Sequence, residues 1–236
     1  MRLSYLFRNK DYCDLIQLQD MRISYSQFGE DLVLLSILES TVRKRENGFY
    51  VDVGAFNPWK YSNTALLHNF FGWTGINIDA NPGSIELFKS ARPNDINLVA
   101  AISDVIEELE FSIFNHPALN TLDKNLHKNL RKKQEAKAPF EVKEVLSVTT
   151  QRLDDIFHQY SNQFVNIDVL SVDAEGFDLK VLKSNNWEIY QPTVILVEQH
   201  TLKFNELDSD LTYLFLTSKG YKLVSRCFVT SIYVKE

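Results

Sequence analysis

The sequence predicts a doubly wound α/β fold, in which a mostly parallel, seven-stranded sheet ends in a C-terminal antiparallel hairpin. Short runs of strand-forming residues alternate with segments of helical periodicity. These runs are apolar throughout rather than at every second position, which is typical of parallel strands buried on both faces. The last two runs, 221–225 and 228–234, follow each other directly and can pair as a hairpin. This combination indicates a Rossmann-like sheet.

The N-terminal half predicts the order strand, helix, strand, helix, strand. Residues 1–25 are expected to form an arm or a helix, and residues 26–236 the domain. Ser26 is expected to cap the first helix of the domain, which runs to about residue 45. There follow a strand at 49–53, a helix at 65–71, a strand at 74–78, a helix at 82–91 capped by Asn81, and a strand at 97–102.

The C-terminal half resumes this alternation after a less regular middle. Strands are expected at 108–114 and 142–148, on either side of an irregular, basic insertion at about 115–140. The later elements are a helix at 151–160, a strand at 169–172, a helix at 177–184, a strand at 193–197, a helix at 208–219 and the hairpin.

Composition limits the class of protein. The chain has 236 residues, of which 44% are hydrophobic, enough for one sizeable domain. The net charge of −6 argues against a general nucleic-acid binder. The longest stretch without charged residues, Tyr61 to Ile78, is too polar to span a bilayer. Cys13 and Cys227 are too few for a disulfide framework, so we expect a soluble protein of the cytoplasm.

Polar residues follow the predicted parallel strands at their carboxyl ends, where open α/β sheets bind ligands. Asp52 and Gly54 follow the first strand. Asp79 follows the second, 25 residues after Gly54, where a nucleoside-binding unit carries the acid that accepts hydrogen bonds from ribose. Ser103 and Asp104 follow the third strand and can bind an adenine amino group.

The glycine pattern distinguishes the ligands that such a site could take. No second glycine lies between Gly54 and Thr64, whereas a dinucleotide site needs further glycines for its pyrophosphate. Asp52 would also repel phosphate, so the site suits a nucleoside without phosphates, such as S-adenosylmethionine (SAM). A nicotinamide-dependent oxidoreductase and a non-catalytic nucleoside-binding module of the same fold are the alternatives.

Longer strings carry a family resemblance. SYSQFGEDLVLLSIL, GFYVDVGAFNPWKYSNTALLHNFFGWTGINIDANP, NLVAAISD, VTTQRLDDIF and LSVDAEGFDLKVLKS occur in this order. Together they resemble the FkbM-type SAM-dependent methyltransferases, over about Ser24 to Val197. The resemblance implies a class I methyltransferase fold and methylation of a hydroxyl oxygen on a sugar, a glycan or a sugar-bearing metabolite.

The resemblance also implies which residues contact the cofactor. Asp52 and Gly54 belong to its methionine side, Asp79 to its ribose, and Ser103 with Asp104 to its adenine. Asp79 stands where the family more often has Glu, and the shorter carboxylate can accept the same hydrogen bonds. The full expected set is Gln27, Asp31, Asp52, Gly54, Asn57, Ser62, Asn63, Asp79, Ala80, Asn81, Ser103 and Asp104.

Three residues at later strand ends are candidates for catalysis. Asp173 and Glu175 follow the fourth parallel strand, beside the expected point of methyl transfer, where a carboxylate can orient or deprotonate a hydroxyl. The alternative is that either residue caps the helix near Gly176. His200, after the fifth strand, has an ordinary pKa suited to a base, or is a hydrogen-bonded surface residue.

No metal is expected, although Asp173 and Glu198 could hold a divalent ion, because the sequence shows no dense ligand cluster. The insertion carries a basic stretch, which either attracts an anionic acceptor or is a solvated helix face. Its members are Lys124, Lys128, Arg131, Lys132, Lys133 and Lys137. The acceptor, the position methylated and the oligomeric state do not follow from the sequence.

Overall fold

The computed structural model describes residues 22–42, 46–115, 120–123 and 141–236. The predicted arm at 1–25 lies almost entirely outside these residues. The main sheet consists of β1 (Phe49–Val53), β2 (Thr74–Asp79), β3 (Ile96–Val99), β7 (Val169–Val172), β8 (Val194–Glu198), β9 (Tyr221–Cys227) and β10 (Thr230–Lys235). The strand order is β3-β2-β1-β7-β8-β10-β9, and β10 runs antiparallel to both of its neighbours. The predicted α/β fold with its C-terminal hairpin is confirmed.

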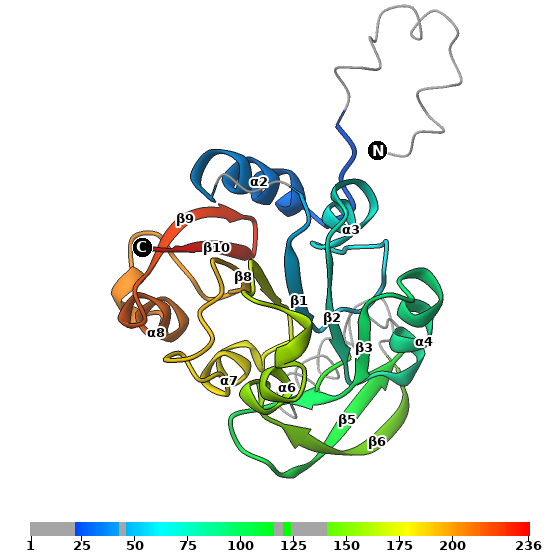
Figure 1. Ribbon diagram of the computed structural model, residues 1–236. Helices are drawn as coiled ribbons and strands as arrows, with labels where there is room; N and C mark the ends of the chain where they lie inside the picture. Colours follow the sequence, from blue (N-terminus) through cyan, green and yellow to red (C-terminus); the bar gives the residue numbers. More distant parts are fainter. Residues whose placement is uncertain (1–21, 43–45, 116–119, 124–140) are drawn as a thin grey trace, which may run out of the picture.

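Helices cover both faces of this sheet (Figure 1). They are α2 (Glu30–Ile37), extended by a π-helical turn at Leu38–Val42, α3 (Ala65–Phe71), α4 (Pro82–Ala91), α6 (Leu153–Gln159), α7 (Asp178–Lys183) and α8 (Leu211–Ser218). Side chains of α6, α7 and α8 form one core with one face of the sheet. Side chains of α2 and α3 form a second core with the other face. Among the described residues, no helix is long and apolar enough to cross a membrane.

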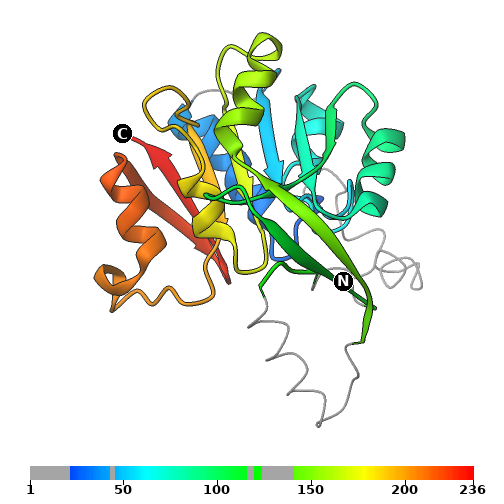
Figure 2. The same cartoon turned by 90° about the horizontal axis from the view of Figure 1, so that it is seen from below.

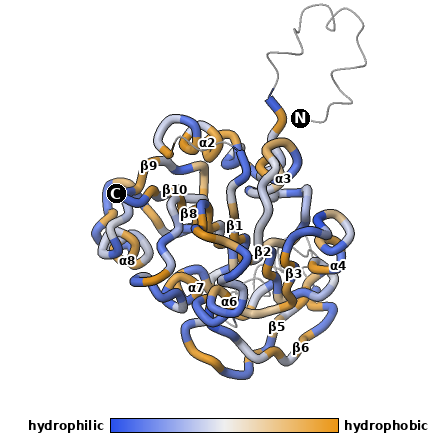
Figure 3. The backbone as a smooth tube through the Cα atoms, in the orientation of Figure 1, coloured by the Kyte–Doolittle hydropathy of each residue, from blue (hydrophilic) through white to orange (hydrophobic). Residues whose placement is uncertain are grey.

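The central strand β1 shows why the apolar runs predicted a buried parallel sheet. Val51 pairs in register with Ile76 of β2 on one side and with Leu170 of β7 on the other. Val51 and Val53 point into the first core, whereas Tyr50 points into the second. Both faces of β1 are therefore covered, and Figure 3 shows hydrophobic segments in the strands of the sheet, with β8 among the most hydrophobic.

A second, smaller sheet corrects the prediction of one strand at 97–102. The chain leaves the main sheet at Ala100, so that this segment forms β3 and a separate β4 (Ala101–Ile102). Together with β5 (Glu108–Phe114) and β6 (Val142–Gln151), β4 makes a three-stranded sheet of order β4-β6-β5 beside the main one (Figure 2). Because β4 pairs with Thr150 and Gln151, these residues stay extended, and α6 starts at Leu153 rather than at 151.

Three predicted element ends are also corrected. α2 begins after Gly29, a left-handed residue with φ of 88°, which occupies the N-cap position in place of Ser26. The Ser26 hydroxyl still accepts from the Asp31 amide in the first turn at 3.2 Å, and it donates to the Asp31 carboxylate at 2.8 Å. Helix α8 begins after Asp210, whose carboxylate accepts from the amides of Thr212 and Tyr213. Strand β10 begins at Thr230, because Phe228 takes the left-handed conformation of the hairpin turn.

Candidate active site

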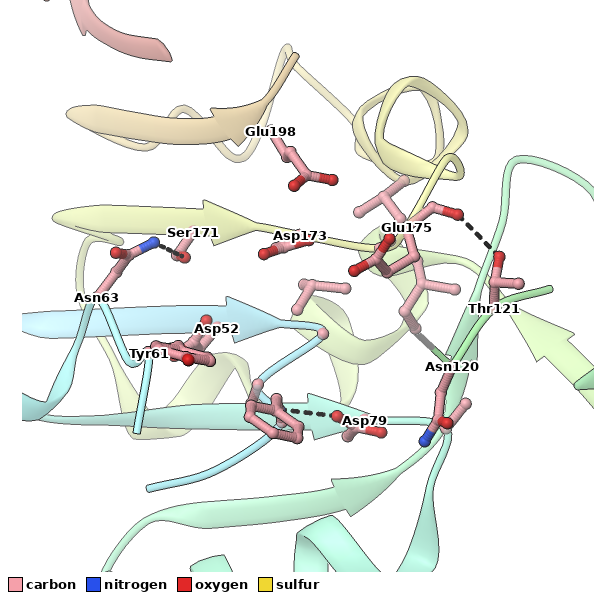
Figure 4. Close-up of a pocket in the computed structure, with 18 of the residues that line it drawn as sticks. Asp52, Tyr61, Asn63, Asp79, Asn120, Thr121, Ser171, Asp173, Glu175 and Glu198 are labelled. Carbon is pink, nitrogen blue, oxygen red and sulfur yellow. Dashed lines mark hydrogen bonds between the residues drawn. The ribbon is translucent and has the colours of Figure 1, made fainter. Parts of the chain in front are cut away.

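A cavity of about 340 Å³ opens at the carboxyl ends of the parallel strands. It lies where β1 has β2 on one side and β7 on the other, which is the point at which the strand order reverses. Its size is within the range of small-molecule sites. The predicted residues that line it are Gln27, Asp52, Gly54, Ser62, Asn63, Asp79, Ala80, Asp173, Glu175 and His200. Figure 4 shows several of these side chains around the cavity.

Gly54 forms the floor of the cavity between β1 and β7. Its φ of 78° is in the left-handed region. A Cβ at this position would lie 1.7 Å from the backbone carbonyl oxygen of Asp173. Only glycine therefore allows the loop after β1 to pass so close to the loop after β7, and it leaves backbone accessible to a ligand.

Asp79 is fixed at the end of β2 by two backbone amides. Phe56 N–H donates to Oδ2 at 2.8 Å, and Asn81 N–H donates to Oδ1 at 2.7 Å. Each carboxylate oxygen keeps a further lone pair for a ligand. Burial raises the pKa of Asp79 to about 6, and the two amide hydrogen bonds oppose this rise.

Asp52 connects the cavity to a buried polar network that the sequence did not reveal. We define this network as Tyr50, Thr64, Asn77, Arg92 and Asp95. Thr64 Oγ1 donates to Asp52 Oδ2 at 2.8 Å and accepts from the Arg92 guanidinium at 2.9 Å. Burial raises the pKa of Asp52, and these neighbours oppose that rise.

Arg92 holds the loop that precedes α3. It is 1% exposed, and it donates to the Pro58 carbonyl at 2.6 Å and to Ser62 Oγ at 3.1 Å. It also donates to Tyr50, whose hydroxyl in turn donates to Asp95. An arginine just after a helix usually lies at the surface and interacts favourably with the negative end of the helix dipole. The sequence therefore gives no sign that Arg92 is buried.

Three carboxylates meet at the other end of the cavity, and we call Asp173, Glu175 and Glu198 the acidic cluster. One carboxylate oxygen from each residue lies within 4.8 Å of the other two. Figure 4 shows them converging from the ends of β7 and β8. Glu198 Oε1 also pairs with His200 Nε2 at 3.1 Å.

The pKa values in the acidic cluster are shifted upward. Asp173 faces the cavity, but the surrounding protein desolvates its carboxylate, and this effect together with the charge of Glu198 raises its pKa well above the ordinary value. Burial, followed by the charge of Glu198, raises the pKa of Glu175 to about 8. Burial also raises the pKa of Glu198 itself. Such grouped shifts are typical of functional sites.

The loop after β7 does not use Asp173 or Glu175 as helix caps. Residue Phe177 stands at the N-cap of α7 and makes no side-chain cap. Asp178 accepts the loop amides instead, from Ala174 at 2.8 Å and from Gly176 at 3.1 Å. Glu175 is held with a positive φ of 45°, an uncommon conformation for a residue other than glycine.

Five predicted cofactor residues do not line the cavity. Asp31 is fully buried and accepts hydrogen bonds from Ser24 and Ser26, so its carboxylate is committed to local structure. Asn57 and Asn81 accept amides of their own turns, at Trp59 and Lys60 and at Gly83. The other two are Ser103 and Asp104, which follow β4 in the second sheet rather than β3 in the main one.

Other lining residues were missed by the sequence analysis. The second sheet and its continuation supply Phe111, Asn120, Thr121 and Leu122. Thr121 Oγ1 donates to the Glu175 carbonyl at 2.8 Å, which ties this segment to the loop after β7. The aromatic residues Phe28 and Phe228 line the mouth, with ring centroids 4.6 Å apart. Contacts between segments distant in the sequence bring these residues to the cavity, and a single sequence does not reveal such contacts.

The residues present fit SAM. The Gly54 gap admits a ligand against the backbone, Asp79 offers acceptors for ribose hydroxyls, and Asp52 offers negative charge to a cationic amino-acid chain. The model of the methyltransferase FkbM domain matches residues 52–223. No relative was found among curated proteins. The match selects the methyltransferase among the three functions that the sequence left open. The chain belongs to the FkbM methyltransferase family and is a SAM-dependent methyltransferase.

Proposed function

We propose that the enzyme methylates a hydroxyl oxygen of a sugar, a glycan or a sugar-bearing metabolite. The observation that carries this proposal is the acidic cluster at the end of the cavity, with aromatic rings at the mouth. Carboxylates accept hydrogen bonds from sugar hydroxyls, and aromatic rings pack against the apolar face of a sugar ring. Phe28 and Phe228 are 45% and 73% exposed, so their rings are free to take part in such packing.

The cofactor end of the cavity supports a matching arrangement for SAM. We assign Asp52 and Gly54 to its methionine side, together with Ser62 and Asn63, and Asp79 to the ribose. Ala101 and Ile102 line the cavity just before Ser103 and Asp104. We therefore assign the adenine ring to this apolar wall; contact of its amino group with Ser103 and Asp104 stays a prediction, because neither residue lines the cavity.

The chemistry follows from this placement. SAM supplies a methyl group whose bond to the sulfonium sulfur breaks as the bond to the acceptor oxygen forms. The protein must hold the hydroxyl in line and take its proton. Asp173 lies next to the loop that carries Gly54, because a Cβ on Gly54 would collide with the Asp173 carbonyl. We assign Asp173 the role of orienting and deprotonating the hydroxyl, with Glu175 and the His200–Glu198 pair beside it.

Asp79→Ala is expected to weaken SAM binding by about tenfold to a few hundredfold, because hydrogen bonds to a carboxylate contribute roughly 1.5–3 kcal/mol each. The wild-type affinity should also fall as the pH drops through about 6, because protonated Asp79 can no longer accept two hydrogen bonds. Calorimetry at several pH values measures both effects. Asp208→Ala, an exposed aspartate away from the cavity, is the matched control. Unchanged affinity in Asp79→Ala would contradict the ribose assignment.

The proposed acceptor class has a direct test. Cells with and without the gene are compared by mass spectrometry of their glycans and sugar-bearing metabolites. We expect a species heavier by one CH₂ group in cells with the gene, and its formation by the purified enzyme with SAM. Methylation of an amine or a carboxylate by the purified enzyme, in place of a hydroxyl, would contradict the proposal.

Two finer parts of the proposal rest on sequence. The basic stretch 124–137 either attracts an anionic acceptor or is a solvated surface, and it lies outside the described residues. A cytoplasmic location is proposed because the two cysteines lie far apart in the sequence, which fits a reducing compartment.

A further inference from the structure

We propose that the acidic cluster of Asp173, Glu175 and Glu198 binds one divalent cation of the Mg²⁺ or Mn²⁺ class at the acceptor end of the cavity. This inference deepens the proposed function, on which its role in catalysis rests. It reverses the expectation of no metal, since the fold brings together carboxylates that the sequence shows far apart.

The spacing of the cluster suits a single ion. One oxygen from each of the three carboxylates lies within 4.8 Å of the others. Two oxygens on opposite sides of Mg²⁺ are about 4.2 Å apart, and those around Ca²⁺ are about 4.6–5.2 Å apart. The three oxygens can therefore reach one ion with small side-chain adjustments. Carboxylate oxygens are the ligands that Mg²⁺, Mn²⁺ and Ca²⁺ prefer.

A second observation comes from the hydrogen bonds of Glu198. Its side chain is 10% exposed, and one oxygen, Oε1, pairs with His200. The other, Oε2, is buried and receives no hydrogen bond from a nitrogen or hydroxyl donor among the described residues, although the Asp173 carboxyl lies close enough to the Glu198 carboxyl to share a proton with it. Figure 4 shows the Glu198 carboxylate pointing to Asp173. A buried oxygen without a partner is costly, and a cation between these side chains would satisfy it.

The charges around the cluster favour the same conclusion. Asp178 and Asp52 add negative charge from the adjacent helix and strand, and both raise the pKa of Asp173. Among the described side chains, His200 of the loop after β8 is the one basic group that pairs with the cluster. It is 66% exposed, and water screens any charge that its ring carries. A divalent cation would offset the repulsion among the carboxylates far more effectively.

An ion at this place defines the acceptor more narrowly. Three carboxylate ligands leave about three positions of an octahedral ion for oxygens of the acceptor or water. Two neighbouring hydroxyls of a sugar ring can then bind together, which positions one of them and favours loss of its proton. We therefore infer an acceptor with vicinal hydroxyls.

The metal site is tested on the full chain without SAM. Mn²⁺ is titrated and followed by electron paramagnetic resonance, with Mg²⁺ as competitor. We expect one saturable site whose affinity falls at least tenfold in Glu198→Gln and in Glu175→Gln. The exposed Glu188→Gln is the matched control and should bind Mn²⁺ as the wild type does. Circular dichroism verifies folding, and calorimetry should show SAM affinity unchanged within a few-fold.

The outcomes separate this inference from the proposed function. The metal site is refuted if no Mn²⁺ binds, or if Mn²⁺ affinity is the same in both variants as in the wild type. The alternative is then a proton shared between Glu198 and Asp173. Sugar methylation that persists in excess chelator also overturns it, while the proposed function stands. A cluster that binds Mn²⁺ in an enzyme that methylates no hydroxyl would support the site and refute the proposed acceptor class.

Discussion

Turnover of the Asp173→Asn enzyme is expected to fall by roughly a hundredfold or more at saturating acceptor and SAM, the usual size of a general-base effect. The amide keeps the size of the side chain but cannot take the hydroxyl proton or supply negative charge. SAM affinity should stay within a few-fold, because the cofactor loop meets the backbone carbonyl of Asp173 rather than its carboxylate. Steady-state kinetics and calorimetry measure the two quantities separately.

The same substitution at the exposed Asp208 serves as the control and should leave turnover unaltered. Full activity of Asp173→Asn would remove Asp173 from the chemistry. Loss of SAM binding with little change in turnover at saturation would instead assign its carboxylate to the cofactor.

Arg92→Met should lower the free energy of unfolding by about 3–5 kcal/mol, the range found when one partner of a buried ionic network is removed. In the variant the carboxylates of Asp52 and Asp95 stay buried but lose the positive charge of the Arg92 guanidinium. It also leaves Ser62 and the Pro58 carbonyl without a donor. Urea denaturation followed by circular dichroism measures the loss.

Lys89→Met, in helix α4 just before Arg92, is the matched control. Lys89 forms an exposed pair with Glu86 at 2.7 Å, and such pairs contribute about 0.2–1 kcal/mol. A loss in Arg92→Met no larger than in this control would show that the polar network contributes little. Where Arg92→Met still folds, SAM binding should weaken as well, because Arg92 holds the loop that carries Ser62.

The features predicted correctly from the sequence are those that depend on local sequence patterns. The apolar strands and the cluster of Asp52, Gly54 and Asp79 follow from composition and from the geometry of parallel sheets. Ser103 and Asp104 were expected beside them because 97–102 was treated as one strand. The break at Ala100 depends on pairing between β4 and β6, some fifty residues later in the chain, so it has no local signal.

Other parts of the site depend on partners distant in sequence or on competition for hydrogen bonds. Asp31 has the pattern of a pocket residue, but the hydroxyls and amides of Ser24 to Ser26 satisfy its carboxylate locally. Arg92 contacts groups up to 42 residues away in the sequence. Glu198, at the end of β8, lies close to Asp173, which follows the neighbouring strand β7. A single sequence does not show whether a charged residue faces water or another charge.

The main sheet and the second sheet supply different walls of the cavity. Phe111 and Thr121, on its side of the cavity, belong to an appendage outside the seven-stranded sheet, whereas Asp52, Gly54 and Asp79 end strands of that sheet. Thr121 joins the appendage to the loop after β7 through one hydrogen bond to the backbone carbonyl of residue 175. Sequence changes at 108–115 and 120–123 can therefore alter one wall of the cavity without altering the strand ends that carry Asp52, Gly54 and Asp79.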